Sequence, residues 1–413
     1  MSKRALILGM GYFALNVISL SYNAFMPLLY RNFVSNLALV GFLMTIDNIM
    51  AVTLQPWWGA RSDRTHTRFG RRLPYILMCM PLSALFFAVI PFAAQATFGL
   101  LLGSAILLNL AISVYRAPLQ ALLSDVFPVN FRSQASGIAT LVGAVGSFAA
   151  LFGGGLLFRM NMVYPFIVAA GCLVVTTLVI GSGIKEPAYL NLGPTQEELD
   201  LPPSILPALR TLFGLSEKSP LLFLMGAFCI FIAYTGHITW WTTFAKSAFG
   251  MAGGDAAVLL SRNALGFLIG AIPAGLAGRY LGRKRAILAG ILVLVLAYLA
   301  LLVAESNLLL IMLQLCAGVG WALILVNNIV LAQGFAGPQR AGLFTGMYIL
   351  SSEAAQIVGP PITGWMMQTF GPYALWVTCA IALGFGAMLI SRVREGRVRL
   401  DERAFAMALP KAL

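Results

Sequence analysis

Long apolar stretches return along the whole chain, separated by short polar connections. A helix that crosses the hydrocarbon layer of a bilayer needs about 20 apolar residues. Transmembrane β-strands would instead appear as alternating segments of about ten residues, and the sequence has none. The pattern predicts an all-α membrane protein with twelve transmembrane helices. These helices are expected at approximately residues 5–30, 37–60, 73–94, 98–122, 134–158, 162–183, 220–246, 257–279, 285–304, 308–333, 341–368 and 372–391.

The charge pattern agrees with a membrane location and predicts an orientation. Only 10% of the residues are charged, whereas a soluble domain has about 25%. The net charge of +13 does not indicate a nucleic-acid partner, because the basic residues lie in short runs between apolar stretches. Of the 27 Lys and Arg residues, 22 fall on the side of the N-terminus and four on the other side. Since cytoplasmic loops are rich in Lys and Arg, we expect a multi-pass inner-membrane protein with both termini cytoplasmic.

The Pro-rich segment 184–219 is the longest polar connection and divides the chain into two halves. We expect one six-helix bundle at 1–183, a cytoplasmic linker at 184–219, a second six-helix bundle at 220–391 and a cytoplasmic tail at 392–413. A weak repeat relates the halves, because Gly59-x-x-x-Asp63 and Gly275-x-x-x-Arg279 follow corresponding helices. Such repeats are typical of secondary transporters. The prediction is therefore two pseudo-symmetric bundles in a monomer.

Several chemical classes are excluded by motifs that the sequence lacks. It has no G-x-x-x-x-G-K-[ST] motif, so ATP is not expected to drive the protein directly. It has neither HExxH nor GxSxG, and no enzyme activity is expected. The five cysteines lie in apolar stretches without CxxC spacing, so we expect neither disulfides nor a metal site. No cofactor is expected.

Two segments resemble the major facilitator superfamily. Residues 59–72, GARSDRTHTRFGRR, are similar to its signature between helices 2 and 3, and QPWW at 55–58 precedes them. Residues 116–125 and 132–137 are similar to its helix 4–5 region. The resemblance is greatest to the glycoside–pentoside–hexuronide and sucrose-transporter-like branches. It implies a secondary transporter with alternating access, whose partners are a saccharide and the lipid bilayer.

The sequence departs from these branches at two places. Melibiose-type symporters carry two carboxylates near the end of helix 2, where this chain has Ala51 and Gln55. The carboxylate Asp47 lies one turn earlier, so we expect H+ rather than Na+ as the coupling ion. Sucrose carriers place an essential Arg in helix 4 about one turn away from the position of Arg116.

Charged side chains at membrane depth are costly and indicate function. Asp47 and Glu353 are expected near the bilayer midplane, and Arg116 lies deeper in its helix. A carboxylic acid in a low-dielectric cavity can bind and release a proton near neutral pH. The candidates for proton coupling are therefore Asp47, Glu353 and His237. The alternative is a buried network with Arg116 that only holds helices together.

Hydrogen-bonding and aromatic side chains that could face a cavity between the halves are candidates for solute binding. They fit a sugar, but they would also fit a nucleoside or an amphipathic drug. Interhelical hydrogen bonds and an interfacial aromatic belt are the alternatives. The candidates are Asn16, Ser19, Tyr22, Asn23, Asn48, Gln55, Asn109, Tyr115, Arg116, Tyr234, His237, Trp240, Trp241, Trp321, Asn327 and Gln356.

The loops that follow helices 2, 4 and 8 are expected to control gating. Asp63 could engage the start of a neighbouring helix and nearby arginines, closing the cytoplasmic side. The gating candidates are Gly59, Asp63, Arg64, Gly70, Arg71, Asp125, Arg132, Gly282 and Arg283.

Together these features predict a proton-coupled symporter of a sugar or glycoside. A proton-coupled exporter of drug-like or other small organic solutes is the first alternative. A receptor or assembly factor that uses the same fold without transport is the second.

Overall fold

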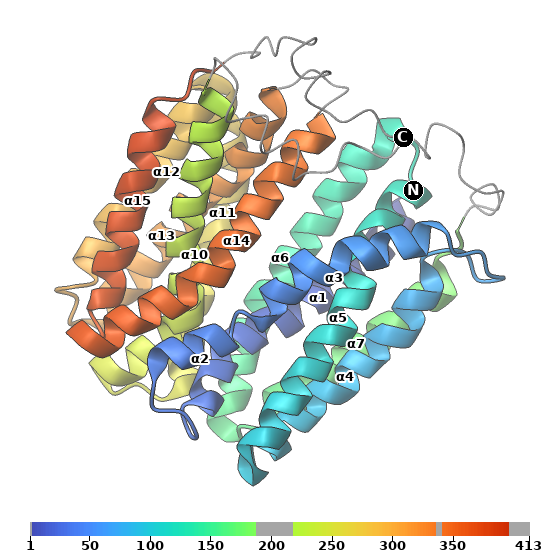
Figure 1. Ribbon diagram of the computed structural model, residues 1–413, viewed down its shortest axis with the longest axis horizontal. Coiled ribbons are helices and arrows are strands. Elements are labelled where there is room, and N and C mark those ends of the chain that lie inside the picture. Colours follow the sequence, from blue (N-terminus) through green and yellow to red (C-terminus); the bar gives the residue numbers. More distant parts are fainter. Residues whose placement is uncertain (1, 187–217, 336–340, 396–413) are drawn as a thin grey trace. The chain divides into compact units, whose positions relative to one another are not determined.

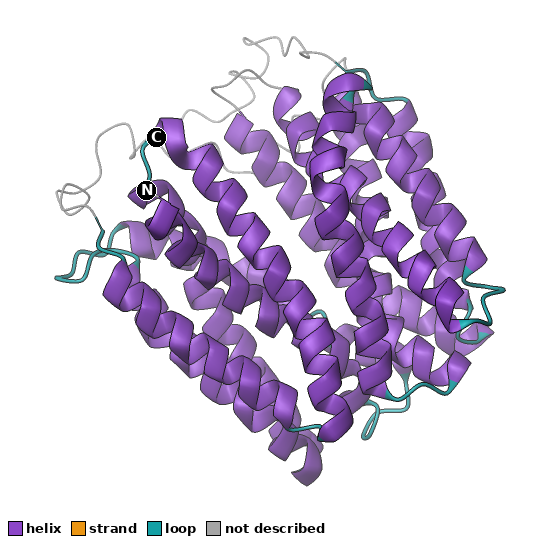
Figure 2. Cartoon of the chain, turned by 180° about the vertical axis from the view of Figure 1, so that it is seen from behind, coloured by secondary structure: helices purple, strands orange, loops and turns teal. Residues whose placement is uncertain are grey.

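The structure is a computed structural model that describes residues 2–186, 218–335 and 341–395. Every regular element in these ranges is a helix, as Figure 2 shows. The helices are α1 (Ser2–Tyr30), α2 (Leu37–Leu43), α3 (Ile46–Asp63), α4 (Leu73–Ala96), α5 (Phe98–Val126), α6 (Val129–Met160), α7 (Tyr164–Gly183), α10 (Ser219–Phe249), α11 (Gly253–Tyr280), α12 (Arg283–Ala300), α13 (Asn307–Gly334), α14 (Ala341–Phe370) and α15 (Ala374–Ser391).

Helices α2 and α3 form one candidate membrane span, Leu37–Asp63. Counted in this way, the described residues contain twelve helical segments, which confirms the predicted all-α architecture. Ten of them are long and apolar enough to cross a membrane. Helix α12 is excluded because its 18 residues begin with Arg283, Lys284 and Arg285, and α14 contains Ser, Glu, Gln and Pro residues that lower its hydropathy.

The observed boundaries lie close to the expected ones. Most helices extend a few residues beyond their apolar stretch, and α6 begins at Val129 instead of residue 134. Side chains stabilise several helix starts, because Asn36 and Thr97 accept the backbone N–H groups of Leu39 and Leu100. The break after α2 was not predicted. There the Thr45 hydroxyl donates to the Phe42 carbonyl at 2.8 Å.

Contacts divide the chain into two compact units. Unit 1 comprises Met1–Thr195, Ile238–Ala264 and Pro360–Pro372, and unit 2 comprises Gln196–His237, Leu265–Gly359 and Tyr373–Leu413. The predicted linker at 184–219 and tail at 392–413 lie largely outside the described residues. The predicted division into bundles at 1–183 and 220–391 stays a prediction.

Within unit 1, α1 packs against α6 and α7, α4 against α5 and α7, and α3 against α5 (Figure 1). The contact between α1 and α6 requires a glycine, because a Cβ atom at Gly146 would lie 2.6 Å from the Phe13 carbonyl oxygen. Within unit 2, α12 packs against α13 and α15. The packing of α1, α3 and α5 creates the polar pocket described next.

Candidate functional site

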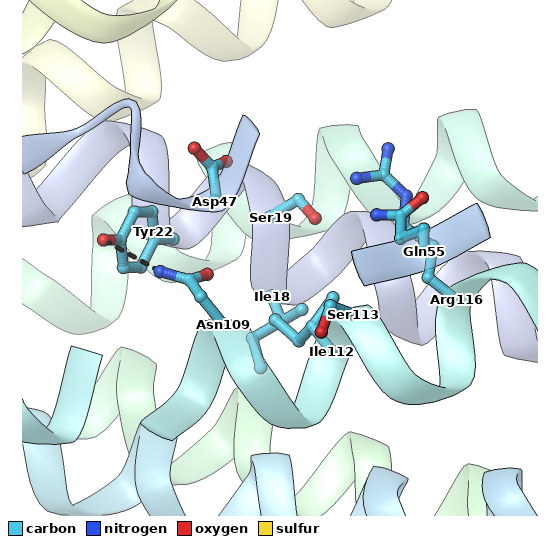
Figure 3. A pocket seen from close by; sticks show the side chains of 9 residues that line it. All are labelled: Ile18, Ser19, Tyr22, Asp47, Gln55, Asn109, Ile112, Ser113 and Arg116. Atoms are coloured by element: carbon cyan, nitrogen blue, oxygen red, sulfur yellow. Dashed lines mark hydrogen bonds between the residues drawn. The ribbon is translucent and has the colours of Figure 1, made fainter. Parts of the chain in front are cut away.

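Three helices of unit 1 line a narrow polar pocket with a volume of about 20 Å³. Helix α1 contributes three of the lining residues, α3 contributes two and α5 contributes four. Six of the nine lining residues were expected to bind solute or a proton. The lining consists of Ile18, Ser19, Tyr22, Asp47, Gln55, Asn109, Ile112, Ser113 and Arg116 (Figure 3).

The α5 side of the pocket is one face of the helix. Asn109, Ile112, Ser113 and Arg116 follow the spacing i, i+3, i+4 and i+7, which aligns side chains along a helix. Ile112 and Ser113, as well as Ile18 on α1, were not predicted from the sequence, although the spacing from Asn109 to Arg116 could have indicated the first two. Tyr115 lies off this face and is completely buried.

The two charged residues lie at opposite ends of the pocket. Figure 3 shows Asp47 near Tyr22 and Arg116 beside Gln55, with Ser19 between them. The Asp47 carboxylate accepts the backbone N–H of Asn48 at 2.8 Å. Within the described part of the chain, the Arg116 guanidinium has no hydrogen-bond or ion-pair partner. Its donors are therefore available to a solute.

The amide and hydroxyl groups between these ends are partly paired with each other. The Asn109 amide donates to the Tyr22 hydroxyl at 3.3 Å. Asn109 and Tyr22 are both buried, so this bond fixes their orientation at the pocket wall. One pocket thus offers an acid, a cation, two amides and three hydroxyl groups.

Three other candidates of α1 and α3 do not line the pocket. The Asn16 amide donates to the Tyr12 carbonyl, and its oxygen accepts the Ser147 hydroxyl of α6 at 3.2 Å. The Asn23 amide donates to the Ser19 carbonyl within α1. Asn48 is half-buried on α3, next to Asp47. The Asn16 side chain is therefore engaged both within α1 and across to α6, and the Asn23 side chain is engaged within α1.

The gating candidates of unit 1 converge on Asp125 near the end of α5. Its carboxylate binds Arg71 in a bidentate pair, with Nη2–Oδ1 at 2.8 Å and Nε–Oδ2 at 3.1 Å. The Arg72 Nε also reaches Oδ2 at 3.1 Å. Both arginines are buried, and the Asp125 side chain is only 10% exposed. The burial of these charges is tolerated because they pair with one another.

Arg72 extends this cluster to α3. Its guanidinium pairs with Asp63, contacts the Ser62 hydroxyl and donates to the Gly59 carbonyl. We call Gly59, Ser62, Asp63, Arg71, Arg72 and Asp125 the clasp. Arg64 and Arg132 are exposed and lie outside it, and the Arg132 side chain donates to the Phe127 carbonyl.

Glu186, which was not predicted as a site residue, contacts the clasp from the segment that follows α7. Its carboxylate accepts the backbone N–H groups of Arg71, Arg72 and Leu73 at 2.7–2.8 Å. Gly70 precedes them with φ +108°, and a Cβ atom there would lie 2.7 Å from the Glu186 Oε2 atom. The glycine is therefore required for Glu186 to reach the start of α4.

A related but simpler arrangement occurs in unit 2. Arg283, at the start of α12, donates to the Asn327 side-chain oxygen at 2.9 Å and to the Gly275 carbonyl at 3.5 Å. Gly282 precedes it with φ +91°, and Glu395 accepts the Lys284 backbone N–H. Asn327 thus accepts a hydrogen bond from Arg283, as Asp125 does from Arg71 in unit 1. This solute-binding candidate is therefore engaged in a structural bond.

His237 belongs to a second polar group in unit 2. Its Nδ1 atom lies 3.0 Å from the Tyr298 hydroxyl and its Nε2 atom 3.2 Å from the Gln314 Oε1 atom. Because the amide oxygen accepts, Nε2 carries the proton and Nδ1 accepts from Tyr298. Trp376 packs edge-on against the imidazole ring. His237, Tyr298, Gln314 and Trp376 are all completely buried.

Four further aromatic and polar candidates lie in unit 2. Tyr234 is half-buried and packs edge-on against the buried Trp321, with ring centroids 4.9 Å apart. Glu353 and Gln356 are half-buried on α14.

The two adjacent tryptophans of α10 are completely buried. Their indole N–H groups donate to the carbonyl oxygens of Pro360 and Ala256. Trp240 and Trp241 therefore contact protein rather than an interfacial water layer.

The sequence matches the profile of the Major Facilitator Superfamily over residues 6–261 and again over residues 223–407. The chain belongs to the major facilitator superfamily. Membership in this family of transporters confirms that the protein is a multi-pass membrane transporter and not an enzyme, and that its substrates are small molecules.

Solved structures share the fold of this major facilitator protein. A nucleoside transporter, NupG, superimposes with a TM-score of 0.73 at 15% sequence identity, covering 98% of this chain and 99% of that chain. A peptide transporter, POT, in complex with sulfate gives 0.72 at 14% identity, with 98% and 95% covered. A bacterial homologue of the human lysosomal transporter Spinster, inward-facing and occupied, gives 0.69 at 15%, with 98% and 96% covered.

No curated protein matches the sequence significantly. At 14–15% identity these similarities show that the proteins share a fold. They do not identify the solute of this major facilitator protein.

Proposed function

We propose that this major facilitator protein is a proton-coupled symporter of a sugar or glycoside in the inner membrane, with both termini in the cytoplasm. The observation that carries the proposal is the pocket of α1, α3 and α5, which combines Asp47 with Arg116 and uncharged hydrogen-bonding groups. Sugars are recognised through many hydroxyl groups, and amides, hydroxyls and charged donors are suitable partners. The motif at residues 55–72 supports an assignment to the glycoside–pentoside–hexuronide and sucrose-transporter-like branch.

Asp47 is the proposed proton carrier in this mechanism. It lies in a polar pocket of a membrane-spanning segment, where a carboxylate is costly without a function. Protonation of Asp47 would change the charge and the hydrogen-bonding capacity of the pocket beside the solute. Glu353 and His237 remain the second and third candidates for proton coupling.

Arg116 is the proposed anchor for the solute. Its guanidinium can donate up to five hydrogen bonds, and no described residue accepts any of them. Ser19, Gln55 and Ser113 would bind the remaining hydroxyl groups from the other sides of the pocket. The gating role of the clasp and of Gly282 and Arg283 belongs to the same proposal.

The decisive experiment is uptake into proteoliposomes under an imposed pH gradient. A panel should contain monosaccharides, disaccharides, glycosides, nucleosides, short peptides and cationic dyes, with protein-free liposomes as the control. We expect accumulation of at least one sugar or glycoside, which a protonophore abolishes. Accumulation of only a nucleoside or a peptide would refute the sugar assignment. Transport of dyes in the opposite direction would favour an exporter, and transport of no compound in any direction would favour a receptor.

A further inference from the structure

A long apolar groove lies on the outer surface of unit 1, separate from the polar pocket. It has a volume of about 460 Å³ and is lined by α4, α5 and the end of α3. On α4 the lining residues Tyr75, Met78, Cys79, Leu82 and Phe86 follow the spacing i, i+3, i+4, i+7 and i+11. This spacing makes a continuous stripe along one helix face.

The opposite wall is a matching stripe on α5. Leu107, Leu110, Ala111 and Val114 follow i, i+3, i+4 and i+7. Met78 is 72% exposed and Leu107 44% exposed, so the groove is open to the outside of the protein. In a membrane-spanning unit this outside is lipid.

The length of the groove corresponds to one leaflet of a bilayer. Eleven residues separate Tyr75 from Phe86, which is roughly 16 Å along a helix. One leaflet of the hydrocarbon core is about 15 Å thick. The groove is therefore long enough for an acyl chain that runs from the interface to the midplane.

Polar and aromatic side chains mark the interfacial end of the groove. The Thr65 and Tyr75 hydroxyls lie 2.7 Å apart, and Trp58 packs edge-on against Tyr75. Trp57 packs against Trp58, and the Arg61 guanidinium lies 5.5 Å from the Trp57 ring centroid. Trp and Tyr are typical of the level of lipid headgroups.

The segment that contributes Thr65 to this end also carries three exposed cations, namely Arg61, Arg64 and Arg68. Among the described residues none of them has a carboxylate partner, because the nearby Asp63 pairs with Arg72 in the clasp. An anionic headgroup at this level would supply the missing counter-charge, and each cation near an anionic surface adds to the affinity.

We propose that this groove is a binding site for an anionic phospholipid, with one acyl chain between α4 and α5 and the headgroup at Arg61, Arg64 and Arg68. The site is continuous with the α3–α4 connection, which begins directly after Asp63, so a bound lipid would contact the clasp region. It requires no assumption about the transported solute.

Native mass spectrometry of the purified full-length protein tests the proposal with phosphatidylglycerol and phosphatidylcholine that have identical acyl chains. We expect the wild type to retain phosphatidylglycerol preferentially. Arg61→Gln combined with Arg68→Gln should weaken its retention by roughly tenfold, whereas Arg31→Gln, an exposed cation in the α1–α2 connection, should not. Equal retention of both lipids by the wild type would overturn the proposal.

A second pair of variants tests the groove itself. Met78→Trp fills it, and Leu85→Trp places the same side chain at an exposed position of α4 outside the lining. We expect loss of bound phosphatidylglycerol only in Met78→Trp. Equal retention in both would overturn the acyl-chain assignment. If Met78→Trp is not monodisperse, Leu107→Trp fills the groove from α5.

Discussion

Glu186 caps the helix that begins beside Arg71, since its Oε2 atom accepts the Arg71 backbone N–H at 2.7 Å. The other carboxylate oxygen accepts the N–H groups of Arg72 and Leu73. An anion at a helix start satisfies backbone donors and interacts favourably with the helix dipole. This contact fixes the segment that follows α7 to the first turn of α4, next to the clasp.

We expect Glu186→Ala to lower the free energy of unfolding by about 1–2 kcal/mol, because three backbone donors lose their acceptor. Thermal unfolding of the purified protein in detergent measures the change. Glu305→Ala is the matched control, since Glu305 is exposed in the α12–α13 connection. Equal unfolding temperatures for the two variants would show that the contact does not stabilise the protein.

Asp47→Asn should abolish solute accumulation driven by a pH gradient while exchange of labelled for unlabelled solute continues. The amide cannot carry a proton, but it retains the size of the carboxyl group. The ratio of internal to external solute should fall to about one in a proteoliposome assay. Asp255→Asn, which removes a half-buried carboxylate paired with Arg159, serves as the control. Continued accumulation by Asp47→Asn would move the proton to Glu353 or His237.

Arg116→Gln should weaken solute binding by tenfold or more, which corresponds to the loss of a charge-assisted hydrogen bond. The unfolding temperature should hardly change, because no described residue forms a hydrogen bond or an ion pair with this guanidinium. Arg283→Gln provides the contrast, since Arg283 bonds Asn327 and should destabilise the fold. Binding by isothermal calorimetry and unfolding by differential scanning separate the two effects. A large loss of stability in Arg116→Gln would indicate a structural role.

His237→Phe should lower the free energy of unfolding by roughly 2–4 kcal/mol, since Tyr298 and Gln314 would each lose a buried partner. If this is its main role, variants that still fold should keep the dependence of uptake on the pH gradient. Uptake measured at several imposed gradients checks this directly. Loss of the dependence in folded protein would instead assign His237 to the proton path.

The helices were predictable because each is encoded by one continuous apolar stretch. The face of α5 that lines the pocket was predictable only in part. Asn109 and Arg116 are conspicuous in an apolar helix, whereas Ser113 and Ile112 become recognisable only when the helix rotation is known. Tyr115 has suitable chemistry, but it points away from the pocket and into the core.

Contacts between residues distant in sequence were the least predictable. Glu186 lies in a Pro-rich polar segment, and its partners are backbone groups more than 110 positions earlier. Nothing in the identity of Arg71 or Arg72 indicates such a partner. A Glu occurs a few residues after both α7 and α15, and each accepts a backbone N–H near the start of a helix. A comparison of the two halves of the sequence could have revealed this pair.

The break between α2 and α3 has a mechanical consequence for Asp47. It creates a new helix start within a membrane span, where the first N–H groups of a helix need acceptors other than the carbonyl groups of that helix. Asp47 is in this first turn, and its own carboxylate accepts one of these groups, the N–H of Asn48. A neutral carboxyl group is a weaker acceptor than a carboxylate. Protonation of Asp47, as proposed above, would therefore weaken the hydrogen bond that holds the first turn of α3.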